Sequence, residues 1–175
     1  MQFPDPGPAL QGIPWAVVGA AATRLYMPER LTRDLDILVR FADRDQVHDR
    51  LQRAGWTVQG ELAVPGTHWS TPFGEGIDVL ELSEPWVEEA LKAAQNNRDA
   101  QGFPVLTLSY LSLMKIAAGR VQDLADVTRM LGQAADNQLD AVRALIRTYM
   151  PEALPDVESM ITLGRLELAD SDGRP

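Results

Sequence analysis

Residues 15–40, WAVVGAAATRLYMPERLTRDLDILVR, carry the strongest structural signal in the chain. The stretch begins with an apolar run that meets Gly19, continues through small residues, and ends in Asp34-Leu35-Asp36-Ile37-Leu38-Val39. This alternation of polar and apolar residues is typical of a strand, in which side chains two apart point to the same face. Asp34 and Asp36 are therefore predicted to lie side by side, with the apolar residues between them facing a core.

Two carboxylates held this close repel each other unless a positive charge lies near both. Mg²⁺ is a natural partner, because it binds protein carboxylates together with waters and substrate phosphates. The alternative is a solvated pair on an edge strand, although aspartate is depleted in strands. Asp78, in the apolar strand pattern GIDVLEL of residues 76–82, favours the metal site. If the two strands are neighbours, three carboxylates meet on one patch; otherwise Asp78 is an aspartate bonded to a turn.

The composition is that of an ordinary globular protein. The 175 residues are 45% apolar and 23% charged, with no cysteine and no apolar run long enough to cross a membrane. We expect a cytoplasmic protein with no membrane partner. The net charge of −9 disfavours a broad non-specific grip on nucleic acid, so nucleic acid is expected only as an acceptor substrate.

Strands and helices are mixed in the first hundred residues, and the chain is almost wholly helical after Thr107. The pattern predicts an α+β fold: a small mixed β-sheet with flanking helices, followed by a C-terminal helical bundle. The expected divisions are an extended N-terminal segment (1–14), an α/β core (15–106), a helical region (107–168) and a loose tail (169–175). Strands are predicted at 15–19, 34–40, 56–60, 68–72, 76–82 and 103–106.

A second group of charged residues lies in the helical region. Lys115 sits in an otherwise apolar helix, where a lysine with a buried stem and an exposed charge is the common case. Asp123 and Asp126 follow Gly119 and share one helix face. Capping and a salt bridge between Asp123 and Arg120 would explain the aspartates without catalysis.

Four polar residues outside these groups are weaker candidates. Arg30 and Thr32, just before the aspartate pair, could reach a phosphate or simply fix the loop. His48 and His68 have no paired spacing and are interpreted as surface histidines. Neither a P-loop nor a GxGxxG motif is present, so glycine-loop nucleotide folds are not supported.

Three of these segments together resemble the nucleotidyltransferase superfamily with the DNA polymerase β-like fold. The first is Val17-Val18-Gly19-Ala20 followed by Arg30-Leu31-Thr32-Arg33-Asp34-Leu35-Asp36-Ile37, and the second is the later strand with Asp78. The third is Leu113-Met114-Lys115-Ile116-Ala117-Ala118-Gly119-Arg120 with Asp123-Leu124-Ala125-Asp126. The resemblance covers about residues 15–131 and is nearest to a branch that contains abortive-infection toxins and uncharacterised relatives.

The resemblance implies a role for each matching residue. Asp34, Asp36 and Asp78 would be catalytic and would hold Mg²⁺. Nucleotide binding would fall on the following residues: Gly19, Ala20, Arg30, Thr32, Lys115 and Asp123. Ala20 departs from the pattern, because active members usually have glycine or serine there. Alanine keeps the backbone N–H but loses a donor and some backbone freedom, which weakens nucleotide binding.

The activity that the resemblance implies is Mg²⁺-dependent transfer of a nucleoside monophosphate from a nucleoside triphosphate to a hydroxyl. The acceptor would be an RNA end, a protein or a small molecule. The alternative is a non-catalytic module of the same fold that acts as a nucleotide sensor or as half of a toxin–antitoxin pair. A cognate toxin or antitoxin protein is then an expected partner.

Overall fold

The computed structural model describes residues 3–28, 32 and 34–172. Its elements fall into two compact units. The first contains Met1–Ala22 and Leu31–Leu106, and the second contains Thr23–Arg30 and Thr107–Pro175. The main chain thus passes into the second unit between Leu106 and Thr107, at the point where the sequence becomes helical.

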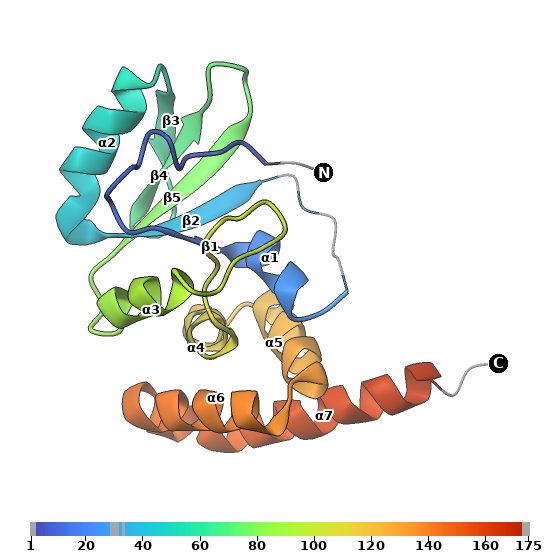
Figure 1. The fold of residues 1–175 in the computed structure, drawn as a ribbon. Helices are drawn as coiled ribbons and strands as arrows, with labels where there is room; N and C mark the ends of the chain where they lie inside the picture. Colours follow the sequence, from blue (N-terminus) through green and yellow to red (C-terminus); the bar gives the residue numbers. More distant parts are fainter. Residues whose placement is uncertain (1–2, 29–31, 33, 173–175) are drawn as a thin grey trace. The chain divides into compact units, whose positions relative to one another are not determined.

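The first unit is built on a mixed five-stranded sheet with the strand order β1-β2-β5-β4-β3 (Figure 1). Strand β2 runs parallel to β5, and the other neighbouring pairs are antiparallel. The bounds of the strands are as follows: β1 Ala16–Val18, β2 Leu35–Arg40, β3 Thr57–Glu61, β4 Gly66–Ser70 and β5 Gly76–Leu82. The helices of this unit are α1 Gly19–Ala22, α2 Arg44–Arg53 and α3 Val87–Ala94.

One face of the sheet forms the core of this unit. Leu35, Ile37 and Val39 of β2 are fully buried, as are Ile77 and Val79 of β5. Because side chains alternate along a strand, the residues between them, including Asp36 and Asp78, point to the opposite face. The aspartates are half-buried there, whereas Leu38 on the same face is fully buried, so this second face of the sheet is polar only at its aspartate end.

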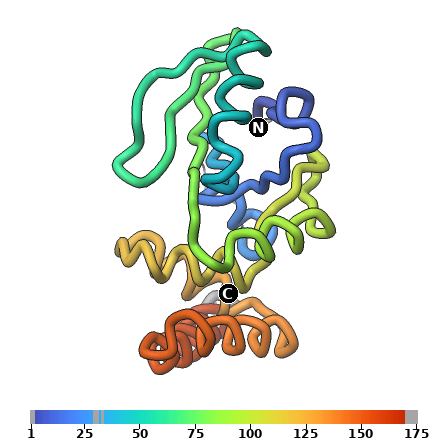
Figure 2. Tube along the Cα trace, turned by 90° about the vertical axis from the view of Figure 1, so that its left-hand side faces the viewer, coloured from blue at the N-terminus to red at the C-terminus, as the bar shows by residue number. Residues whose placement is uncertain are grey.

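The second unit is helical. Its helices are α4 Leu108–Ala118, α5 Val121–Gln133, α6 Asp136–Tyr149 and α7 Leu154–Asp172. Figure 2 shows α6 and α7 lying side by side. Helix α5 packs closely on α7 at two glycines, since a Cβ built on Gly132 would overlap the backbone of Gly164. No helix of the described residues is long and apolar enough to span a membrane.

The structure corrects several expected element boundaries. The strand expected at 68–72 is β4, Gly66–Ser70, two residues earlier. No strand forms at residues 103–106; Pro104 and Val105 instead form isolated bridges with Arg98 and Val17. The backbone of α7 continues to Asp172, so residues 169–172 are helical where a loose tail was expected, and residues 173–175 lie outside the described part of the chain.

Candidate functional site

Asp36 and Asp78 are neighbours across the sheet. The parallel register of β2 and β5 makes them direct Cα partners, and the antiparallel register of β5 and β4 pairs Asp78 with His68. Residues opposite each other on adjacent strands point to the same face. One row on the second face of the sheet therefore contains Asp36, Asp78 and His68.

The absence of a side chain on Gly19 leaves room for the Asp36 carboxylate. Gly19 follows Val18, the β1 partner of Asp36, and begins the short helix α1 with a φ of +61°. A Cβ built on Gly19 would overlap Oδ2 of Asp36. The carboxylate thus lies directly against the backbone where β1 turns into α1, which only a residue without a side chain permits. Ala20, the second residue of this turn, lies in α1 and is half-buried.

Asp34 directly precedes β2 and is exposed. It is two positions before Asp36, with only Leu35 between them, and this is the spacing at which strand side chains share a face. The Thr32 hydroxyl donates a hydrogen bond to the Asp34 carbonyl over 3.3 Å. Arg30 lies outside the described residues. Within the side chains of residues 3–28, 32 and 34–169, no three His, Asp or Glu groups already stand close enough together to hold a metal ion.

The Asp78 carboxylate has a partner that sequence reasoning missed. His68 Nδ1 lies 2.5 Å from Asp78 Oδ1. The His68 side chain is 41% exposed and that of Asp78 is 26% exposed, so both remain accessible to solvent. His68 thus lies partly exposed at the surface, as expected, but nothing in the sequence indicated its contact with Asp78.

His48 likewise has a partner, on the other face of the sheet. It lies on α2, and its Nε2 atom is 2.5 Å from Oε1 of Glu81, a residue that is 3% exposed. Thr67 donates a hydrogen bond to the same oxygen over 2.8 Å, and Trp69 Nε1 donates to Thr67 Oγ1 over 3.1 Å. This buried polar network joins α2 to strands β4 and β5.

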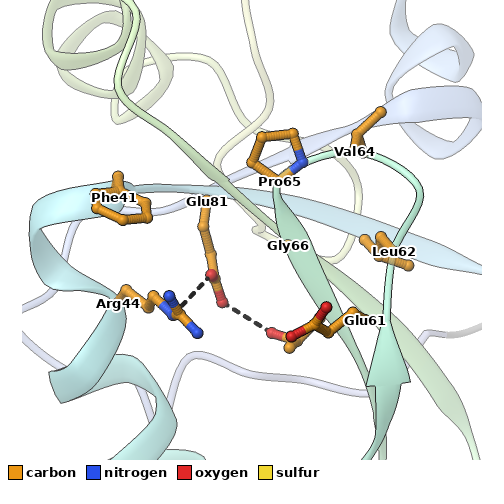
Figure 3. Close-up of a pocket in the computed structure, with 9 residues that line it drawn as sticks. Phe41, Arg44, Glu61, Leu62, Val64, Pro65, Gly66 and Glu81 are labelled. Atoms are coloured by element: carbon orange, nitrogen blue, oxygen red, sulfur yellow. Dashed lines mark hydrogen bonds and ion pairs between the residues drawn. The ribbon is translucent and has the colours of Figure 1, made fainter.

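A pocket of about 350 Å³ opens beside this network. In Figure 3 the side chains of Arg44 and Glu81 point toward each other, with Phe41 next to them. Arg44 Nε lies 3.2 Å from Glu81 Oε2. Because Asp78 and Glu81 are three residues apart on β5, the pocket and the aspartate row lie on opposite faces of the sheet.

In the second unit, Lys115 forms a buried ion-pair cluster with two aspartates. Lys115 is 4% exposed, and its Nζ atom lies 2.7 Å from Asp123 Oδ1 and 3.0 Å from Asp126 Oδ2. Arg120 Nε lies 2.5 Å from Asp123 Oδ2, which confirms the expected salt bridge. The lysine is thus not of the common type with an exposed charge. Burial alone raises the pKa of Asp123 and is the largest single effect, but hydrogen bonds from Lys115 and Arg120 together lower it below its ordinary value.

The expected site residues thus fall into two groups. Gly19, Asp36 and Asp78 come together on the sheet of the first unit, with Asp34 next to β2. Lys115 and Asp123 contact each other in the second unit. The signal that could have identified His68 is the antiparallel pairing of β4 with β5. Using it requires the correct position of β4, and the strand expected from the sequence was displaced by two residues.

Comparison with solved structures relates this arrangement to known proteins. The chain is similar to the solution structure of the antibiotic-resistance factor ANT(2'')-Ia, with a TM-score of 0.51 and 16% identity over 94% of this chain and 90% of that chain. A crystal structure of ANT(2'')-Ia with adenylyl-2''-tobramycin gives a TM-score of 0.49 and 16% identity over 92% and 93%. The lincomycin-bound lincosamide antibiotic adenylyltransferase LnuA gives 0.45 and 10% over 69% and 87%.

Neither a protein-family model nor a curated protein matches the sequence. At these identities the similarity concerns the fold alone. The α+β architecture expected from the sequence is confirmed, and the chain has the nucleotidyltransferase fold.

Proposed function

We propose that this protein is a Mg²⁺-dependent nucleotidyltransferase, which transfers a nucleoside monophosphate from a nucleoside triphosphate to a hydroxyl group. The observation that carries the proposal is the register of β2 and β5, which makes Asp36 and Asp78 direct neighbours. A glycine turn against the Asp36 carboxylate completes the arrangement. Two adjacent carboxylates on one sheet face repel each other, and a cation bound between them would relieve that repulsion.

The donor set fits Mg²⁺. Asp34, Asp36 and Asp78 offer only carboxylate oxygens, which are the ligands that this hard cation prefers. Asp34 is exposed and lies outside the strand, so its side chain is able to turn toward the other two. Bound there, Mg²⁺ would neutralise charge on the triphosphate.

The reaction requires an attack on the α-phosphorus. The acceptor hydroxyl oxygen forms a bond to this phosphorus, the bond from it to the oxygen bridging to the β-phosphate breaks, and pyrophosphate leaves. The hydroxyl proton must go to a base. Asp78 is our candidate, because its side chain is accessible and, within the described residues, hydrogen bonding engages only one of its two oxygens.

Nucleotide contacts are proposed for Gly19, Ala20, Arg30 and Thr32, which flank the aspartates in the sequence. For Lys115 and Asp123, binding a nucleotide would require a buried ion pair to break. The Lys115 ammonium group is held by two carboxylates, so a phosphate would have to displace Asp123 or Asp126 to reach it. Breaking such a buried pair is expensive.

For the acceptor we propose a hydroxyl compound of small size ahead of RNA, because the net charge of −9 disfavours a large polyanion. Antibiotic hydroxyl groups are a reasonable first panel, since the solved structure of the same fold is an antibiotic-resistance factor. Protein side chains, an RNA end, and a toxin or antitoxin partner remain further candidates.

The test is calorimetric titration of the full chain with ATP, GTP, CTP and UTP, with and without Mg²⁺. We expect metal-dependent binding of at least one nucleotide, and loss of that binding in Asp36→Asn. Asp49→Asn on α2 is the matched control, because Asp49 is half exposed and, in the part of the chain that the structure describes, is paired only with Arg53. Absence of nucleotide binding in a folded sample would contradict the transferase and favour the non-catalytic module.

A further inference from the structure

We propose that His68 is a positioning residue for Asp78, and so for the carboxylate patch as a whole. The inference rests on the function proposed above. It adds a residue on β4, which the aspartate motifs do not contain. Its basis is the row Asp36, Asp78 and His68 across three neighbouring strands.

The direction of the hydrogen bond follows from the chemistry of the two groups. An ionised carboxylate carries no proton and only accepts hydrogen bonds. His68 must therefore donate from Nδ1 to Asp78 Oδ1, across the 2.5 Å that separates them. This contact fixes which ring nitrogen carries hydrogen, and it leaves Nε2 pointing away from the carboxylate.

The ring also lies close to the backbone of Gly76. A Cβ built on Gly76, the first residue of β5, would lie 3.1 Å from His68 Cε1 and 3.6 Å from Nε2. The imidazole thus rests over a residue without a side chain, in space that most other residues would occupy. Both ends of the contact belong to paired strands, which limits the positions open to the donor.

The consequence for Asp78 is a restricted orientation. With Oδ1 bound to His68, rotation of the carboxylate about its χ2 angle breaks a charge-assisted hydrogen bond. Oδ2 has no hydrogen-bond partner among the described residues, so it stays available to a cation or to a hydroxyl proton. Groups that orient a metal-binding carboxylate in this way typically contribute about 10- to 100-fold in metal affinity or activity.

The first experiment compares two variants of nearly equal size. In His68→Asn the side-chain amide retains an N–H near the position of Nδ1, whereas His68→Leu offers no donor. Mn²⁺ serves as the probe, with its affinity for the full chain measured by titration. We expect His68→Leu to weaken Mn²⁺ binding about tenfold or more, and His68→Asn to stay much closer to the wild type. Equal weakening in both variants would overturn the proposal.

The second experiment observes the ring directly. The chain has two histidines, so its ¹⁵N imidazole spectrum contains two ring systems, which a His48→Gln variant assigns. We expect His68 Nδ1 to be protonated and its resonance to move in Asp78→Asn. An Nε2–H tautomer, or a spectrum unchanged by Asp78→Asn, would contradict the hydrogen bond.

These measurements separate failure of the inference from failure of the proposed function. A wild-type protein that binds Mn²⁺ and a nucleotide, with equal affinity in His68→Leu, refutes only the role of His68. A wild-type protein that binds no nucleotide refutes the transferase, while the ring spectrum still tests the contact. Where an acceptor is found, the loss in His68→Leu should appear in kcat, with little change in KM for the nucleotide. Thermal melting of each variant establishes that it is folded.

Discussion

The carboxylate of Asp36 occupies the space that a side chain on Gly19 would need. A Cβ at residue 19 would overlap Asp36 Oδ2, and the φ of +61° at Gly19 lies in the left-handed region that favours glycine. Two independent constraints therefore act on one residue. The backbone conformation concerns the turn between β1 and α1, whereas the overlap concerns the proposed metal site.

Gly19→Ala should therefore lower both stability and binding. The left-handed conformation costs a residue with a Cβ about 1–2 kcal/mol. The added methyl group must also displace the Asp36 carboxylate, since that is the movable end of the contact. We expect the loss of Mg²⁺-dependent nucleotide binding in calorimetry, together with a lower free energy of unfolding in urea.

Gly102→Ala separates these two effects. Gly102 has a φ of +84°, and a Cβ built there meets nothing within 4 Å. This variant should lose a similar amount of stability and keep its nucleotide binding. Wild-type nucleotide affinity in Gly19→Ala would show that Asp36 does not need its observed position.

The sequence predicts the position of Asp36 and Asp78 better than that of the residues on the neighbouring strand β4. Alternation in residues 34–39 and 76–82 identifies two strands and their polar faces, and the family pattern makes them neighbours. Strand β4, Gly66–Ser70, lacks such a signal, because its polar and apolar residues do not alternate strictly, so the sequence does not determine its register with β5. The partner of Asp78 on β4 could not be read from the sequence for this reason.

The ion-pair cluster of Lys115 could not be predicted from the sequence for a different reason. Asp123 and Asp126 are eight and eleven residues from Lys115 and lie on the next helix, beyond Gly119. The meeting of these groups depends on how α4 and α5 cross, which helical periodicity does not determine. The local pair of Arg120 and Asp123 was predictable, because residues three apart on a helix are neighbours.

Lys115→Met should destabilise the protein strongly. The substitution leaves Asp123 and Asp126, which are 5% and 0% exposed, without the ammonium group between them. Removing one member of a buried ion pair typically costs about 3–5 kcal/mol. Urea denaturation of the full chain gives this loss directly.

Lys92→Met is the control for that variant. Lys92 lies on α3 with its side chain 76% exposed, and among the described residues its one ion pair is a long contact of 3.9 Å with Glu89. Exposed pairs of this kind contribute little, so stability should change by less than about 1 kcal/mol. If Lys115→Met is as stable as Lys92→Met, the ion pairs of Lys115 contribute little to stability. Lys115 could then exchange its aspartate partners for a phosphate, the role that the family resemblance implies.

Lowering the pH should reduce the contribution of Asp123 to the free energy of unfolding. Burial is the largest effect on its pKa and acts upward, but the hydrogen bonds from Lys115 and Arg120 outweigh it, so the pKa lies below the ordinary value of 3.8. A group whose pKa is lower in the folded state stabilises it above the unfolded pKa. That stabilisation is lost as the pH falls from about 4 through the folded pKa. The difference in unfolding free energy between wild type and Asp123→Asn should narrow over this range; a constant difference would contradict the assignment.

Gly164→Ala should loosen the packing of α5 on α7. A Cβ at Gly164 would overlap the Thr128 carbonyl oxygen and lie 2.8 Å from the Gly132 Cα atom, so backbone atoms of one helix would have to move away from the other. Alanine has the higher helix propensity by about 1 kcal/mol, so propensity alone would make the variant more stable. We expect the clash to outweigh this gain and the melting temperature to fall. Gly60→Ala on β3 is the control, since its Cβ would meet nothing within 4 Å. A higher melting temperature for Gly164→Ala would mean that the two helices are able to separate without loss.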